Sequence, residues 1–104
     1  MTTDDVQTRI LALLRQVFER HRHELHGYRI ILFGSRATGR ARPRSDFDIG
    51  VIGDRPLPLP VFYAIEEEIE NLPTLYRIDW VDLNRASATL REEALREGRT
   101  LYEA

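Results

Sequence analysis

The sequence predicts an α/β (α+β) fold in which a small mixed β-sheet is flanked by helices, in the order helix, strand, strand, helix, strand, helix. Short β-favouring segments alternate with segments whose apolar residues recur at helical spacing. The segment between the second and third strands is long enough for a crossover helix, which makes these two strands parallel neighbours. The polar loop between the first two strands favours an antiparallel pair. The sheet is therefore expected to be mixed.

The N-terminal third of the chain predicts a helix followed by a strand. The helix is expected around Val6–Phe18, where apolar residues recur at helical spacing: Val6, Ile10, Leu13, Leu14 and Val17. We expect it to continue through a histidine-rich segment and to stop at Gly27, because glycine readily adopts a left-handed cap. The strand is expected at Tyr28–Phe33, which is short, apolar and β-favouring.

The middle of the chain predicts a polar loop and a second strand. Gly34 ends the first strand, and the residues after Ser35 are expected to form a helical turn that Gly39 limits. The second strand is expected at Asp46–Ile52, where side chains alternate between two faces. One of these faces carries Asp46, Asp48 and Gly50.

The C-terminal half predicts a helix, a strand and a last helix. The first helix is expected over Val61–Leu72, with one apolar stripe and its glutamates elsewhere. The strand is expected at Tyr76–Leu83, with Trp80 in the core. The last helix is expected at Ala88–Glu97, followed by Leu101 facing inward.

The composition is that of one domain spanning residues 1–104. The chain has 104 residues, of which 42% are hydrophobic and 31% charged, and its formal net charge is -2. It contains no cysteine, which excludes disulfide scaffolds and cysteine-based zinc or nucleophile sites. The near-neutral charge argues against direct nucleic-acid binding, although the arginines between Arg36 and Arg44 leave room for a local anion site.

The hydropathy pattern points to a cytoplasmic protein. The opening segment, Met1–Arg9, lacks a basic stretch followed by an apolar one. No apolar run approaches the ~20 residues that span a bilayer. We therefore expect no membrane association.

The most informative residues are Gly34 and Ser35, followed ten residues later by Asp46-Phe47-Asp48. Gly34 lets the backbone approach a ligand closely, while the Ser35 hydroxyl and the amides at a helix start can donate to phosphate oxygens. Asp46 and Asp48 project from one strand face, and two such close carboxylates repel each other unless cations bridge them. This pattern predicts a phosphate-binding turn beside a magnesium site.

A third carboxylate is expected on the neighbouring strand. Asp79 and Asp82 lie three residues apart, so they point to opposite faces and at most one can join the site. Alternation cannot choose between them. We favour Asp79 and keep Asp82 as the alternative.

One stretch resembles the signature of minimal nucleotidyltransferases in the DNA polymerase beta superfamily: GSRATGRARPRSDFDIGV. The residues that match at the family's intervals are Gly34, Ser35, Ala37, Gly39, Ser45, Asp46 and Asp48. A second stretch, RIDWVDL, resembles the strand that carries the family's third aspartate, at the position of Asp79. The likeness covers nearly the whole chain in element order, and it implies the nucleotidyltransferase fold.

The resemblance also implies roles for individual residues. The carboxylates that it implies as catalytic and as ligands of two Mg²⁺ ions are Asp46, Asp48 and Asp79. The residues that it implies around the nucleotide are Gly34, Ser35, Arg36, Arg44 and Ser45. Arg36 and Arg44 are included because guanidinium groups make charge-assisted contacts with phosphates. Asp79 would also help to deprotonate the acceptor hydroxyl.

The functional hypothesis is a magnesium-dependent nucleotidyltransferase that moves a nucleoside monophosphate, AMP from ATP, onto a hydroxyl of a partner protein. The chain is too short for the extra domain with which larger nucleotidyltransferases hold their acceptor. The resemblance therefore implies a partner, a small helical HEPN toxin encoded nearby, for which this protein is the antitoxin. The alternative is a non-catalytic stoichiometric antitoxin or a nucleotide-binding subunit of a heteromer. The nucleotide, the acceptor residue and the stoichiometry stay open.

Overall fold

The computed structural model describes residues 3–104, with side chains from residue 5 onward, so residues 1 and 2 of the opening segment lie outside the described residues. The helices are α1 (Thr3–Arg20), α2 (Ser35–Thr38), α3 (Leu59–Glu70) and α4 (Ala88–Glu97). The strands are β1 (Arg29–Phe33), β2 (Phe47–Ile52), β3 (Ile78–Asp82) and β4 (Arg99–Glu103).

The four strands form one mixed sheet in the order β3-β2-β1-β4. β1 pairs antiparallel with β2, and β2 pairs parallel with β3 through the crossover helix α3. Both relations were expected from the lengths of the connections, and the predicted fold class is confirmed. β4 pairs antiparallel with the other edge of β1.

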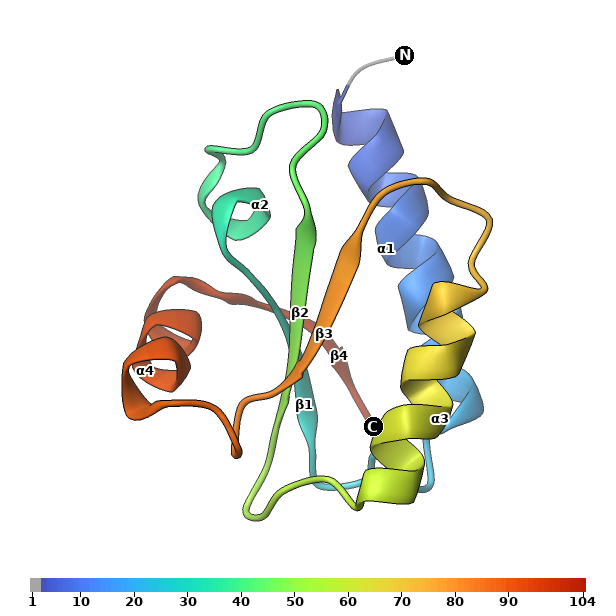
Figure 1. The fold of residues 1–104 in the computed structure, drawn as a ribbon, viewed down its shortest axis with the longest axis vertical. Coiled ribbons are helices and arrows are strands. Elements are labelled where there is room, and N and C mark those ends of the chain that lie inside the picture. The colour runs from blue at the N-terminus through green and yellow to red at the C-terminus, as the bar shows by residue number, and fades with distance from the viewer. Residues whose placement is uncertain (1–2) are drawn as a thin grey trace.

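Helices cover both faces of this sheet (Figure 1). α1 and α3 lie side by side on one face, where they bury the larger part of the core. Trp80 is part of this core, as expected: its ring stacks between Phe18, at 5.6 Å, and Phe62, at 5.4 Å. α4 covers the opposite face, over a smaller cluster that includes Ile31 and Ala94.

The first helix is shorter than the sequence predicts. α1 ends at Arg20, and a series of turns leads from there to Gly27, which does adopt the expected left-handed conformation, with φ of 87°. The His21 ring contacts Glu24 within these turns and Glu68 on α3. The contact with Glu68 joins these turns to α3 and holds the chain where it leaves the axis of α1.

The structure contains a fourth strand, β4, that the sequence does not predict, and this corrects the predicted order. Gly98 ends α4 in an extended conformation, and the chain then turns back along β1. Leu101 faces inward as expected, but it does so from a strand, and its carbonyl accepts a hydrogen bond from Arg15 Nε at 3.2 Å. Only one of the five β4 residues is buried, so the strand lacks the repeated apolar alternation that would reveal it.

None of the helices within residues 3–104 is long and apolar enough to cross a membrane.

Candidate active site

The turn after β1 is built on Gly34. Its φ of 72° and ψ of -157° lie in a region that residues with a side chain rarely adopt. A Cβ at this position would also collide with the carboxylate of Asp48. Both the backbone and the space therefore require glycine, and the group that approaches its backbone is a proposed metal ligand.

The short helix α2 follows directly. The amides of Ala37 and Thr38 already donate to the Gly34 carbonyl, at 3.1 and 3.3 Å. The Ser35 hydroxyl and the amides of Ser35 and Arg36 are therefore the candidate phosphate donors of this turn. Gly39, with φ of 77°, ends the helix where the sequence predicts.

Asp48 and Asp79 meet because their strands are parallel neighbours. They are direct register partners, Asp48 on β2 and Asp79 on β3, and both point to the side of the sheet that Gly34 borders. Asp46 lies one residue before β2 and its side chain is exposed. The two strands thus bring together two of the three predicted carboxylates, with the third at the strand entry.

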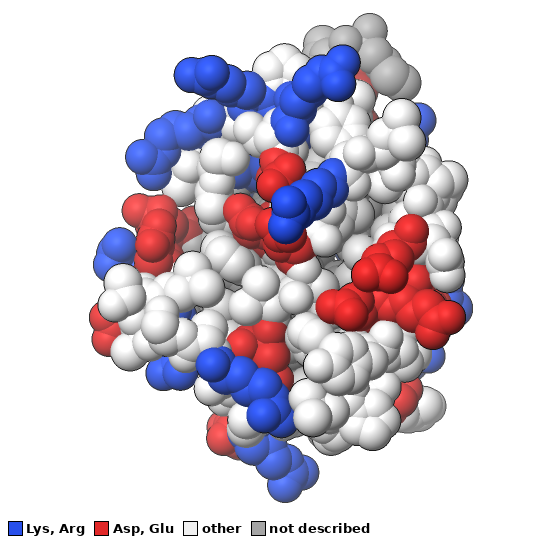
Figure 2. All heavy atoms as spheres, in the orientation of Figure 1, with Lys and Arg blue, Asp and Glu red and all other residues white. Residues whose placement is uncertain are grey.

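A cleft of about 900 Å³ opens over this pair, within the size range of small-molecule sites. It runs from α3 across β3 to α4, and its polar lining includes Asp48, Glu70, Tyr76, Arg77, Asp79 and Glu93. Figure 2 shows acidic side chains gathered near the middle of this face against a basic side chain. The cleft is therefore acidic, with one guanidinium at its centre.

The surroundings of Asp48 raise the pKa of its carboxyl. Burial raises the pKa of the Asp48 carboxyl above its ordinary value of 3.8, and the charges of Asp79 and Asp46 raise it further. A hydrogen bond with Asp79 acts in the same direction, and Arg77 opposes it. Arg77 Nε also donates to Asp79 Oδ1 at 3.0 Å. A positive charge is thus favourable at this position.

Within the described residues, no group of three His, Asp or Glu side chains is already arranged to hold a metal ion. Asp79 is paired with Arg77, and Asp46 lies in the loop before β2. The chemistry of the donors nonetheless fits Mg²⁺, which prefers carboxylate oxygens and few protein ligands. A cation that bridges neighbouring carboxylates also stabilises their charged forms.

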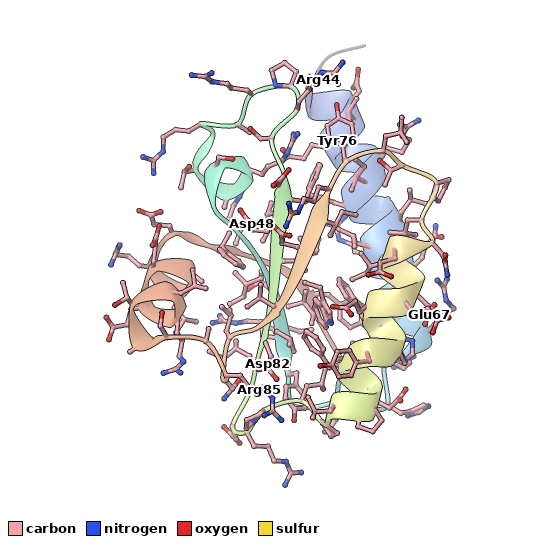
Figure 3. All side chains as sticks on the ribbon, viewed as in Figure 1. Arg44, Asp48, Glu67, Tyr76, Asp82 and Arg85 are labelled. Carbon is pink, nitrogen blue, oxygen red and sulfur yellow. The ribbon has the colours of Figure 1, made fainter. Side chains whose placement is uncertain are left out.

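Asp82 lies away from this site. It is 6% exposed, and its carboxylate accepts hydrogen bonds from the Leu57 and Asn84 amides, at 2.9 and 3.0 Å. An ion pair with Arg85 adds to these contacts. Figure 3 shows Asp82 and Arg85 at the opposite end of the strands from Asp48. Its contacts hold the loop after β2 in place.

Arg36, for which the resemblance implies a place at the nucleotide, is buried in the structure. Its side chain is only 2% exposed, and its guanidinium donates to the backbone carbonyls of Ser45 and Pro43 instead of facing the cleft. The carbonyl oxygens that solvate the guanidinium belong to the loop that follows α2. The guanidinium is thus engaged with the backbone of this loop.

The other two loop residues proposed for the nucleotide lie outside the cleft lining. The Ser45 hydroxyl accepts a hydrogen bond from the Arg42 amide at 2.8 Å, inside a tight turn. Arg44 is exposed on the same loop, at the edge of the molecule in Figure 3. Movement of this loop would be needed to bring Arg44 toward the carboxylates.

Sequence reasoning missed Arg77 as a cleft residue, and Tyr76 also lines the cleft. The signal for Arg77 was present, because it lies two residues before Asp79 and so shares its strand face. Tyr76 lies just before β3, where alternation gives no information. Its placement depends on the loop between α3 and β3.

Comparison with known proteins agrees with this geometry. The family described as Polymerase beta, Nucleotidyltransferase matches residues 14–104. Protein adenylyltransferase MntA of Aphanizomenon flos-aquae is 36% identical over 84 residues, which is 71% of this chain and 55% of that protein. This chain thus spans about half the length of that relative.

Solved structures share the fold. A toxin-antitoxin crystal structure with AMP-PNP superposes with a TM-score of 0.65 at 24% identity, covering 90% of this chain and 73% of that one. A tri-AMPylated HEPN toxin in complex with MNT antitoxin, from Shewanella oneidensis, gives a TM-score of 0.56 at 23% identity, covering 99% and 74%. The fold, the glycine turn and the match over residues 14–104 together show that this chain belongs to the polymerase beta nucleotidyltransferase family.

Proposed function

We propose that this protein is a magnesium-dependent nucleotidyltransferase that transfers AMP from ATP to a hydroxyl of a partner protein. The observation that carries the proposal is the register pair Asp48 and Asp79, set beside Gly34 in a cleft large enough for a nucleotide. The adenylyltransferase activity of the relative at 36% identity supports AMP as the transferred group.

Five residues have a role in this proposal. Asp46, Asp48 and Asp79 would hold two Mg²⁺ ions, which would supply positive charge to the triphosphate. Gly34 and Ser35 orient the triphosphate through backbone and hydroxyl donors. The acceptor oxygen forms a bond to the α-phosphorus, the bond from that phosphorus to the bridging oxygen breaks, and pyrophosphate leaves. In this proposal, Asp79 accepts the proton of the acceptor hydroxyl.

The partner in this proposal is a HEPN toxin, and the transfer makes the protein its antitoxin. The support comes from the Shewanella oneidensis complex, in which a HEPN toxin is AMPylated and bound to an MNT antitoxin. The cleft opens at the edge strand β3, and the described residues offer no further element that could hold an acceptor there. A partner approaching this edge would present its hydroxyl to the carboxylates.

The test is to co-express this protein with the helical protein encoded beside it and to measure the intact mass of that neighbour. We expect an added AMP on a hydroxyl side chain, and its loss with Asp48→Asn. Glu67→Gln, on the exposed face of α3 outside the cleft lining, is the matched control and should leave the adduct in place. An unmodified toxin that Asp48→Asn still neutralises would instead identify a stoichiometric antitoxin.

A further inference from the structure

The guanidinium of Arg36 ties together three segments around the carboxylates. Its Nε and Nη2 both donate to the Ser45 carbonyl, at 3.1 and 2.8 Å, and Nη2 also reaches the Pro43 carbonyl at 3.3 Å. It lies over the Phe47 ring at 4.1 Å and the Tyr76 ring at 5.4 Å. These partners come from the loop after α2, the start of β2 and the entry to β3.

Asp46 is the residue between the two held positions. Its predecessor, Ser45, offers the carbonyl that Arg36 binds, and its successor, Phe47, offers the ring beneath the guanidinium. The Phe47 amide further donates to the Arg77 carbonyl at 2.9 Å. One buried side chain thus contacts the residues on both sides of an exposed carboxylate, the backbone carbonyl of Ser45 and the ring of Phe47.

We infer that Arg36 is a positioning residue, which sets the Asp46 carboxylate beside Asp48 and Asp79 without touching substrate. The inference rests on the proposed metal-dependent function. Residues that orient metal ligands commonly change metal affinity by about 10- to 100-fold when they are replaced. Asp46 needs such support more than its partners do, because it precedes the strand, whereas Asp48 and Asp79 lie within paired strands.

A positioning role and a purely electrostatic role of Arg36 predict opposite effects of Arg36→Met on cation binding. If Arg36 acted only through its charge, its removal would make the site more negative and would strengthen cation binding. If it positions Asp46, its removal loosens a ligand and weakens cation binding. Arg36→Lys keeps the charge but cannot reproduce the planar fork and the stacking, so it should follow Arg36→Met.

The experiment measures Mn²⁺ affinity of the folded protein by calorimetry, without nucleotide or partner. We expect Arg36→Met and Arg36→Lys each to weaken binding about ten-fold. Arg40→Met, which removes an exposed arginine of the same loop, is the control and should stay within about two-fold of the parent. Tighter binding by Arg36→Met, or unchanged affinity in both variants, overturns the inference.

A double-substitution test identifies the ligand through which Arg36 acts. In an Asp46→Asn background, Arg36→Lys should have little further effect on Mn²⁺ affinity, whereas in an Asp79→Asn background its effect should persist. An equal effect in both backgrounds contradicts the inference. If both Arg36 variants fail to fold, Tyr76→Leu removes only one ring from the guanidinium and should weaken binding in the same direction, and parent affinity would then be the contrary result. Failure of the parent to bind Mn²⁺ or to transfer AMP would instead refute the proposed function.

Discussion

Asp48 carries its negative charge at a cost that depends on pH. Its folded-state pKa is raised above 3.8, chiefly by burial and then by Asp79 and Asp46. The folded state therefore holds the proton more tightly than the unfolded state, which stabilises the protein below that ordinary value. This contribution is lost as pH rises through the raised pKa.

Asp48→Asn should therefore stabilise the metal-free protein at neutral pH, by about 0.5 kcal/mol, because it removes one of two facing like charges. Urea unfolding of both proteins over a pH series measures the effect, and the advantage of the variant should grow from acid to neutral pH. Asp54→Asn, on an exposed loop, is the control. A variant less stable than the parent at neutral pH would contradict the proximity of the carboxylates.

Asp79 and Asp82 should respond to the same substitution in opposite ways. Asp79→Asn should lower AMP transfer by about 10²–10⁴-fold with little loss of stability, because it removes a metal ligand and a proton acceptor from a partly exposed position. Asp82→Asn should lower the free energy of unfolding by about 1–3 kcal/mol, because its NH2 group would replace one of the two oxygens that accept from the Leu57 and Asn84 amides and would face a donor there. Transfer per folded molecule should persist. Transfer kinetics and urea unfolding of both variants measure these effects. Loss of transfer in Asp82→Asn together with loss of stability in Asp79→Asn would refute the choice of Asp79 as the site residue.

Among the elements, β4 buries one side chain in the core, and Tyr102 packs against the same cluster. Leu101 is 7% exposed and belongs to the cluster shared with α1, while the neighbouring Thr100 is exposed. Its strand pairs with β1, the strand that leads directly into Gly34. The glycine turn therefore depends on an edge strand that does not itself reach the cleft.

We expect Leu101→Ala to lower the free energy of unfolding by about 2–3 kcal/mol, because it leaves a cavity among buried apolar residues. Thr100→Ala, on the same strand, should change it by less than about 0.5 kcal/mol. Chemical denaturation compares the two. Equal, small effects would mean that the C-terminal segment does not pack as a strand.

The whole molecule places its cleft between the two helical layers. α3 and α4 cover opposite faces of the sheet, and both contribute lining residues on either side of the edge strand β3. Access therefore comes from the edge of the sheet. In the proposed function, the acceptor reaches this edge on the partner protein. Positioning of the two reactants supplies a large part of the rate in such a transfer.

The protein alone should consequently transfer AMP slowly and to unspecific acceptors, and addition of the HEPN partner should accelerate labelling by about 10²-fold or more. Quantitative intact-mass measurements over time, with an unrelated helical protein of similar size as control, provide the comparison. Equal labelling of both proteins would exclude specific positioning by the partner.

Local signals in the sequence were sufficient for most elements. α4 has the predicted bounds because Ser87 caps its first turn, with its hydroxyl accepting from the Leu90 amide, and Gly98 ends it. The parallel pairing of β2 and β3 followed from the length of the connection. The alternation of β2 also placed Asp48 on the strand face opposite the core residues Phe47, Ile49 and Val51.

Other features depended on residues distant in sequence. Alternation could not distinguish Asp79 from Asp82, and only the register of β3 against β2 sets Asp79 opposite Asp48. The burial of Arg36 depended on Phe47 and on the loop that folds over it. The sequence by itself determined which residue types stand near the turn and on which strand face, because these follow from backbone geometry. The tertiary structure decided which charge faces solvent and which is buried, because burial depends on every segment that packs around a side chain.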